Sequence, residues 1–302
     1  MLKYLFAFVI VLTARSLAAQ EEGFCRSGEA MIHYRVFGSG NPVVLINGGP
    51  GMNSEGFASL ASKLSAHHRI IIFDQRGTGK STLLKADSAT VTMHKMAEDM
   101  EALRNHLHIG QWVVMGHSFG GMLASYYATV YPKNIRGMIL SSSGGIDLGL
   151  LSGLDITARL DEGDRDSLRL WNDRIAKGDT SYHARWERGH FLAPAYLYDK
   201  KNIPVITERL TQGNTHINTL VWADMQKIHF NCAQGLQSFK APVLIVQGKQ
   251  DILDEKIGEK AHAVLHNSQF IQLDRCGHYG WLDRPDVYLD LVLKFLEKTD
   301  RS

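Results

Sequence analysis

The sequence predicts an α/β protein with a mostly parallel sheet that helices cover on both faces. Short runs of apolar and β-branched residues recur along the 302-residue chain and alternate with segments of helical periodicity. Strands that alternate with helices pair in parallel through right-handed crossovers. The length suits one large domain with an insertion, or two smaller domains.

The expected strands are of two kinds. Residues 32–37 alternate between apolar and polar side chains, as in a half-exposed strand. The other runs are apolar throughout, which is typical of strands buried on both faces of a parallel sheet. These runs are 43–46, 70–73, 112–115, 138–140, 243–246 and 270–273. Helical patterns between and after them include 93–107 and 286–296.

One long interval lacks buried strands. Between about Gly144 and Lys240 the chain has charged, aromatic stretches with helical patterns, at 158–175, 181–191 and 204–231. Because buried strands return after this interval, we expect one interrupted domain; a boundary before a separate C-terminal domain is the alternative. The predicted core is 28–143 with 241–302, and the predicted helical cap is 144–240.

The N-terminus has the pattern of a secretory signal peptide. Lys3 precedes an apolar run over 4–12, and small residues follow up to Ala19. The run is short for a membrane span, so an uncleaved anchor is the less favoured alternative. We expect residues 1–19 to be removed and the protein to be exported, to the periplasm or beyond, with no stable membrane association afterwards.

Composition excludes several classes of partner. The net charge of +2 gives no reason to expect nucleic acid or an anionic membrane as a partner. Cys25, Cys232 and Cys276 lack the spacing of a metal site, and no H-E-x-x-H motif is present. We therefore expect no metal and no cofactor. One disulfide with a free thiol, or three free thiols, would both fit the sequence.

Residues 116–120 read Gly-His-Ser-Phe-Gly and match the G-x-S-x-G pattern of a nucleophile elbow. They follow the strand expected at 112–115 and precede a helix-compatible run at 122–128. The pattern needs this context, because the sharp turn exposes the serine hydroxyl at the end of the sheet. Ser118 is the candidate nucleophile; on this motif alone, a glycine-rich turn without a catalytic role is the alternative.

A serine nucleophile needs a base and an acid that orients the base. In an elbow protein the acid and then the histidine follow the serine along the chain. Asp251 comes shortly after the strand expected at 243–246, and His278 after the one at 270–273. We expect His278 to be the base and Asp251 the acid. Asp254 and Glu255 are possible substitutes for Asp251.

An oxyanion requires fixed hydrogen-bond donors. One should be the backbone N–H of Phe119, directly after the nucleophile. The other should come from the loop after the strand at 43–46, which reads Asn-Gly-Gly-Pro-Gly over 47–51. Glycines there let the backbone approach the substrate, and Gly49 is the expected donor; a tight turn without a catalytic role is the alternative.

Together these residues resemble the α/β-hydrolase superfamily over almost the whole mature chain. Two segments are similar to the proline iminopeptidase branch: Asn-Gly-Gly-Pro-Gly at 47–51 and Asp-Gln-Arg-Gly-Thr-Gly-Lys-Ser at 74–81. The first departs from the His-Gly-Gly-Pro-Gly of that branch at Asn47. The resemblance implies the α/β-hydrolase fold with a helical cap, and it also assigns the oxyanion donor to Gly49.

The resemblance further implies that acids of the cap and of a loop after the catalytic aspartate grip the free amino group of a peptide. Glu187 stands where one such acid could be, and Ile252 occupies the place of another. The expected function is that of an exported serine hydrolase that acts through an acyl-enzyme and releases N-terminal proline, or a similar residue, from peptides. A general esterase or amidase for small acyl substrates is the alternative, and a non-catalytic binding protein with this fold is a third hypothesis.

Overall fold

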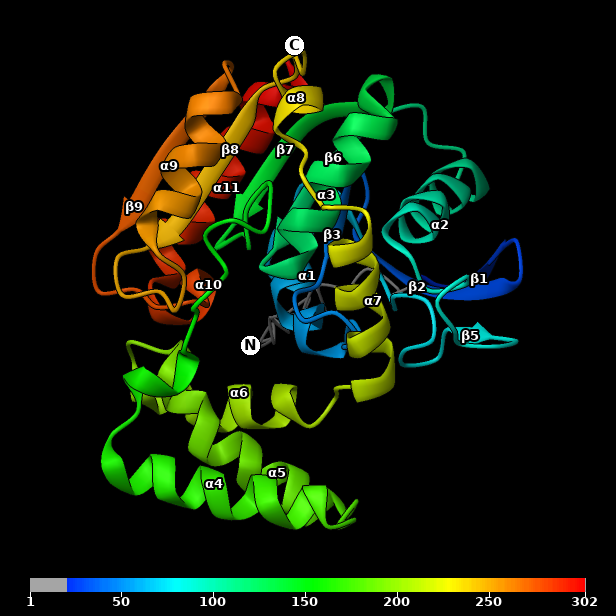
Figure 1. Cartoon of the computed structure of the whole chain (residues 1–302). Helices are drawn as coiled ribbons and strands as arrows, with labels where there is room; N and C mark the ends of the chain where they lie inside the picture. The colour runs from blue at the N-terminus through cyan, green and yellow to red at the C-terminus, as the bar shows by residue number, and fades with distance from the viewer. Residues whose placement is uncertain (1–20, 302) are drawn as a thin grey trace, which may run out of the picture.

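The computed structural model describes residues 21–301, so the predicted signal peptide at 1–19 lies outside the described residues. The described chain forms a sheet with helices on both faces (Figure 1). Its strands are β1 (Glu21–Ser27), β2 (Ala30–Phe37), β3 (Asn41–Ile46), β4 (His68–Phe73), β5 (Thr82–Leu83), β6 (Trp112–His117), β7 (Ile135–Ser141), β8 (Val243–Gly248) and β9 (Ser268–Leu273).

The order of the strands is β1-β2-β4-β3-β6-β7-β8-β9, with β5 paired to β2. Neighbours from β4 to β9 pair in parallel. The antiparallel pairs among these strands all involve β2, which pairs with β1, β4 and β5. The sheet is therefore mostly parallel, as the sequence predicts.

The central strands are apolar throughout because both of their faces are buried. In β3, Val44 and Ile46 belong to the core on one face of the sheet, and Val43 and Leu45 to the core on the other. Successive side chains of a strand point to opposite faces, so a strand covered on both sides needs an apolar residue at every position.

Helices of the core cover the two faces. The first face carries α2 (Met93–His106), α3 (Phe119–Val130) and α9 (Glu255–Val264). The second carries α1 (Ala58–Leu64), α10 (Gly280–Asp283) and α11 (Pro285–Asp300). Two short 3-10 turns, η1 (Glu55–Phe57) and η2 (Pro132–Asn134), complete the core.

Between β7 and β8, across the predicted cap of 144–240, the chain is helical, and this interval divides into two parts. The first, residues 156–210, is called the cap below; in Figure 1 its long helices lie beyond one end of the sheet. It contains η3 (Ile156–Arg159), α4 (Glu162–Ala176), α5 (Tyr182–Leu192), η4 (Ala193–Tyr196), η5 (Lys200–Asn202) and α6 (Ile203–Leu210). The second part, α7 (Thr215–Lys227) and α8 (Ala233–Leu236), returns along the core, where Val221, Met225 and Leu236 join its apolar cluster.

Two strands differ in burial from the sequence expectation. β2 is buried almost throughout rather than half-exposed. Its buried polar side chains have partners, since His33 Nδ1 lies 2.9 Å from Asp74 Oδ2 and Arg35 Nη1 lies 2.8 Å from Glu55 Oε2. β9 is mostly half-buried rather than fully buried, because it is the last strand of the sheet. Within residues 21–301, no helix is both long and apolar enough to cross a membrane.

All three cysteines are buried and unpaired, which answers the question that the sequence left open. Burial raises the pKa of the Cys25 thiol to about 11 and those of Cys232 and Cys276 to about 12. These thiols are therefore protonated at neutral pH and poor nucleophiles.

Candidate active site

Ser118 lies in a strained turn between β6 and α3. Its φ of 55° and ψ of −121° are values that a residue with a side chain rarely adopts. The turn is tight enough to require glycine on both sides. A Cβ on Gly116 would lie 2.2 Å from the carbonyl oxygen of Gly120, and one on Gly120 would lie 2.3 Å from that of Ile46. The spacing of the G-x-S-x-G motif thus follows from the close contact of β6, α3 and β3.

The candidate acid and base meet at the ends of β8 and β9. Asp251 Oδ1 lies 2.7 Å from His278 Nδ1, and both side chains are buried. Because a carboxylate only accepts hydrogen bonds, Nδ1 carries the proton and Nε2 is left to accept one. Ser118 and His278 line the same cavity. The structure therefore brings the three predicted catalytic residues into one site.

The two alternative acids face elsewhere. Asp254 caps α9, where its side chain accepts a hydrogen bond from the backbone N–H of Lys256. Glu255 accepts one from Gln272. Asp251 is thus the acid that contacts His278.

The loop that carries His278 is held by a residue that the sequence did not single out. Asp283 accepts a hydrogen bond of 2.7 Å from the backbone N–H of Gly277, and also binds the backbone N–H groups of Tyr198 and Asp199 in the cap. The backbone N–H of His278 in turn donates a hydrogen bond of 2.7 Å to the backbone carbonyl of Tyr196. These bonds fix the base against the cap.

The carbonyl groups of the loop after β3 are all held by hydrogen-bond donors. The carbonyl oxygens of residues 47–50 accept, in order, from Gln75 Nε2, Arg209 Nη2, Met52 N and Asn218 Nδ2, at 2.8–3.0 Å. Gly49 has a φ of 72°, which glycine adopts without strain. No described residue accepts a hydrogen bond from Gly49 N–H, and Gly49 lines the cavity.

Phe119 also lines the cavity and is the first residue of α3. The first N–H groups of a helix have no partner within it, and they lie at the positive end of the helix dipole. Gly49 and Phe119 therefore both border the cavity beside Ser118, as the oxyanion hypothesis requires.

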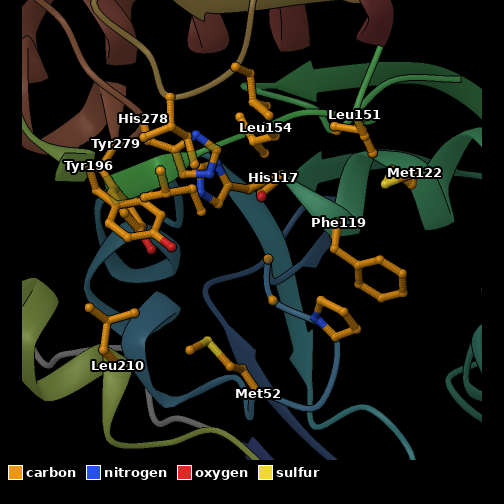
Figure 2. A pocket seen from close by; sticks show the side chains of 18 of the residues that line it. Met52, His117, Phe119, Met122, Leu151, Leu154, Tyr196, Leu210, His278 and Tyr279 are labelled. Carbon is orange, nitrogen blue, oxygen red and sulfur yellow. The ribbon is translucent and has the colours of Figure 1, made fainter. Parts of the chain in front are cut away.

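The cavity has a volume of about 160 Å³. Figure 2 shows Tyr196, Tyr279 and His278 on one side of it and Phe119 and Met122 on the other. Its remaining wall is mostly apolar, from Met52, Leu151, Leu154, Ile156, Leu210, Trp222, Ile252 and Leu253. Within the described chain, no Asp, Glu, Lys or Arg is among its lining residues.

Besides Ser118, two tyrosines contribute hydroxyl groups to this mostly apolar cavity. Burial raises the pKa of Tyr196 and of Tyr279 above the usual value for tyrosine. Both hydroxyls are therefore neutral at physiological pH and can donate or accept a hydrogen bond.

Glu187 does not reach this cavity. It lies on α5, where its carboxylate is 3.9 Å from His183 Nδ1. Ile252, in contrast, lines the cavity with an apolar side chain. Neither position places an acid beside Ser118 in this structure.

His117 is a further residue of the site that the motif did not predict. Its ring centroid lies 4.7 Å from that of His278 and 4.8 Å from that of Trp281. Neither ring nitrogen has a hydrogen-bond partner among the described residues. Burial, with smaller contributions from His278 and Arg209, lowers the pKa of His117 well below its usual value. His117 is therefore an uncharged side chain that packs against the ring of His278.

The fold and this geometry agree with what the chain resembles. The family model of the alpha/beta hydrolase fold matches residues 41–285, so the chain belongs to that family. Its relatives include the proline iminopeptidase of Lactobacillus acidophilus, which is 26% identical over 292 residues, covering 89% of this chain and 95% of the relative. That of Thermoplasma volcanium is 27% identical over 311 residues, covering 94% and 99%.

Solved structures show the same fold in enzymes of more than one activity. The proline iminopeptidase of Mycobacterium smegmatis has a TM-score of 0.66 at 21% identity, covering 93% of this chain and 99% of its own. An esterase from Exiguobacterium antarcticum has a TM-score of 0.69 at 18% identity, covering 91% and 98%. The protein is therefore a serine hydrolase of aminopeptidase or esterase type, and it resembles the proline iminopeptidase branch.

Proposed function

We propose that the protein is an exported serine hydrolase that acts through an acyl-enzyme on esters or amides of small, uncharged acyl groups. The observation that carries the choice of substrate is the cavity beside Ser118, which is apolar and has no charged side chain in its described lining. Apolar walls stabilise an apolar acyl group, whereas a cationic group would lose its hydration there without a carboxylate to compensate.

The reaction begins when Ser118 Oγ attacks the substrate carbonyl carbon and passes its proton to His278 Nε2. Asp251 stabilises the imidazolium that forms. The carbonyl oxygen becomes an oxyanion, which the N–H groups of Gly49 and Phe119 bind. The tetrahedral intermediate then expels an alcohol or amine, which takes the proton from His278, and leaves an ester on Ser118.

Water completes the cycle by the same steps in reverse. His278 accepts a proton from the water as its oxygen attacks the ester carbonyl, and the second oxyanion forms in the same position. Collapse of this intermediate breaks the bond to Ser118 Oγ, which takes the proton back from His278. The carboxylic acid is released and the enzyme is restored.

Release of N-terminal proline is the second candidate, and the proline iminopeptidase relatives favour it. A prolyl group is also small and mostly apolar. Its amine would have to bind the hydroxyls of Tyr196 and Tyr279 or backbone carbonyls, since Glu187 lies away from the cavity. This candidate therefore needs recognition of the amine without an acid.

A panel of matched chromogenic substrates separates the two candidates. It contains p-nitrophenyl butyrate, prolyl-p-nitroanilide and N-acetylprolyl-p-nitroanilide. We expect rapid hydrolysis of the butyrate with a burst of about one p-nitrophenol per enzyme, the sign of an acyl-enzyme. We also expect no preference for the free amine over the acetylated one. Hydrolysis of the free prolyl amide alone would instead support the iminopeptidase.

The control for this panel is Ser118→Ala. It should lower kcat by a factor on the order of 10⁴–10⁶ for every substrate, because the members of a triad act as a unit. It should also abolish labelling by a fluorophosphonate probe. A variant that keeps a tenth of the wild-type activity would remove Ser118 from the mechanism.

Export is proposed from the sequence pattern of residues 1–19 alone. The test is the mass and the N-terminal sequence of the protein recovered outside the cytoplasm after expression of the full chain. Cleavage after Ala19 is expected; retention of the full chain in the cytoplasm would contradict export.

A further inference from the structure

A buried arginine of the cap binds the oxyanion loop directly. Arg209, at the end of α6, is only 3% exposed. Its Nη2 donates to the carbonyl oxygen of Gly48, at 2.8 Å. Its Nη1 donates to the carbonyl oxygen of Asn53, at 2.7 Å, and to Gln212 Oε1, at 2.9 Å. One guanidinium therefore holds two carbonyls on either side of the turn that contains Gly49.

The side chain of Arg209 is tightly packed against the loop that follows β3. No described carboxylate forms an ion pair with it, and its charge lies over the ring of Phe57, 5.2 Å from the centroid. Gly56 leaves room for the side chain, because a Cβ there would lie 2.4 Å from Arg209 Cδ. A buried cation needs strong acceptors, and here they are the two carbonyls, the amide oxygen of Gln212 and the hydroxyl of Tyr279.

We propose that Arg209 is a positioning residue that aims the N–H of Gly49 at the oxyanion. This inference rests on the acyl-enzyme mechanism proposed above. The carbonyl of Gly48 and the N–H of Gly49 belong to one planar peptide unit, in which they point in opposite directions. When Arg209 holds the oxygen away from the cavity, it fixes the N–H toward the cavity.

The charge of Arg209 adds to this effect. A cation at the carbonyl oxygen polarises the peptide unit and strengthens its N–H as a donor. Without the guanidinium the Gly48 carbonyl keeps only the longer bond from Asn47 Nδ2, at 3.2 Å. The peptide unit is then held less firmly, and the Gly49 N–H is no longer fixed in place when the oxyanion forms. Because the oxyanion exists in the transition state and not in the bound substrate, the loss should appear in kcat rather than in KM.

The test measures kcat and KM for p-nitrophenyl butyrate in wild type, Arg209→Met and Arg209→Lys. Arg209→Met should lower kcat about 100-fold, the effect of losing one oxyanion donor, with KM within about threefold. Arg209→Lys keeps the charge but not both hydrogen bonds, and should lose about tenfold. The rate of labelling by a fluorophosphonate should fall in parallel, since the phosphoryl oxygen occupies the same position.

The control is Arg174→Met, another arginine of the cap. Arg174 pairs with Asp179 and stacks on Trp171, so its contacts stay within the cap. It should keep wild-type kcat. Thermal unfolding of each variant shows whether it is folded, and Arg209→Lys decides the matter if Arg209→Met does not fold.

The outcomes distinguish a failure of the role proposed for Arg209 from a failure of the proposed function. Folded Arg209 variants with wild-type kcat and labelling rate would overturn the positioning role while leaving the mechanism intact. A rise in KM at unchanged kcat would also overturn it, because it would assign Arg209 to substrate binding. Wild-type protein that neither turns over the butyrate nor reacts with the probe would instead refute the proposed function.

Discussion

Replacement of Asp251 by asparagine separates the charge of the triad acid from the geometry that holds His278. Asp251 Oδ1 accepts two hydrogen bonds, from His278 Nδ1 at 2.7 Å and from the backbone N–H of Leu253 at 3.2 Å. Asp251 Oδ2 has no partner among the described residues. An asparagine can therefore keep its oxygen at the Oδ1 position and place its NH₂ group at the Oδ2 position. His278 would keep its tautomer, and only the negative charge would be lost.

The size of the effect follows from Coulomb's law. In the transition state His278 carries a positive charge whose centre lies about 4 Å from the carboxylate, which is worth about 4 kcal/mol at an effective dielectric constant of about 20. Each 1.36 kcal/mol changes the rate about tenfold, so kcat should fall about 10³-fold. An asparagine that forced the wrong tautomer would cost about 10⁴-fold in kcat.

The assay is steady-state hydrolysis of p-nitrophenyl butyrate by wild type, Asp251→Asn and Asp254→Asn. Asp254 caps α9, a position that asparagine fills equally well, so this matched variant should retain wild-type activity. A loss smaller than tenfold in Asp251→Asn would refute the role of the charge. A loss as large as that of Ser118→Ala would show that the amide had turned and disrupted the tautomer.

Two further predictions concern residues that contact the triad. His117 is neutral when folded but protonates below a pH of about 6.5 when unfolded, so stability should decrease as the pH falls; the loss between pH 7.5 and 5.5 is about 1.4 kcal/mol. Urea unfolding at both values should show that His117→Phe lacks this loss, and an equal loss in the variant would refute the assignment. Arg159 donates to the carbonyls of Gln250 and Asp251, so Arg159→Met should lower kcat a few-fold to tenfold without changing the fold, at a typical hydrogen-bond strength of about 1 kcal/mol. Stopped-flow measurement of the acylation rate tests this. An unchanged rate would show that the loop carrying Asp251 keeps its position without Arg159.

The parallel strands could be predicted because their signal is local. A strand buried on both faces must be apolar at every position, and such runs stand out in the sequence. β1 was not predicted, because only Cys25 and Ser27 of its seven residues are fully buried. A strand at the edge of a sheet exposes most of its side chains, so its composition differs little from that of a loop.

The same distinction applies to the site. Ser118, Asp251 and His278 could be predicted because each follows a strand that the sequence reveals, in an order that the elbow requires. The residues around them depend on contacts between distant segments. Arg209 and Gly48, for example, are 161 positions apart, and nothing in the sequence near Arg209 marks it as a partner of the oxyanion loop. Glu187 was placed by resemblance alone, and its helix turns it toward His183.

The cap is joined to each of the three loops that carry the chemistry, and this changes what a substitution in it should do. Arg159 binds the backbone of the acid loop at Asp251, the carbonyl of Tyr196 binds the N–H of His278, and Arg209 binds the carbonyl of Gly48. A cap that only covered the cavity would affect KM and substrate choice. A cap that supplies hydrogen bonds to the acid, base and oxyanion loops also fixes their relative positions, and errors of about 1 Å there cost roughly 100-fold in rate. The cap of this hydrolase is therefore part of the catalytic framework. Substitutions of its two side-chain anchors, Arg159 and Arg209, should lower kcat even for substrates that never touch the cap.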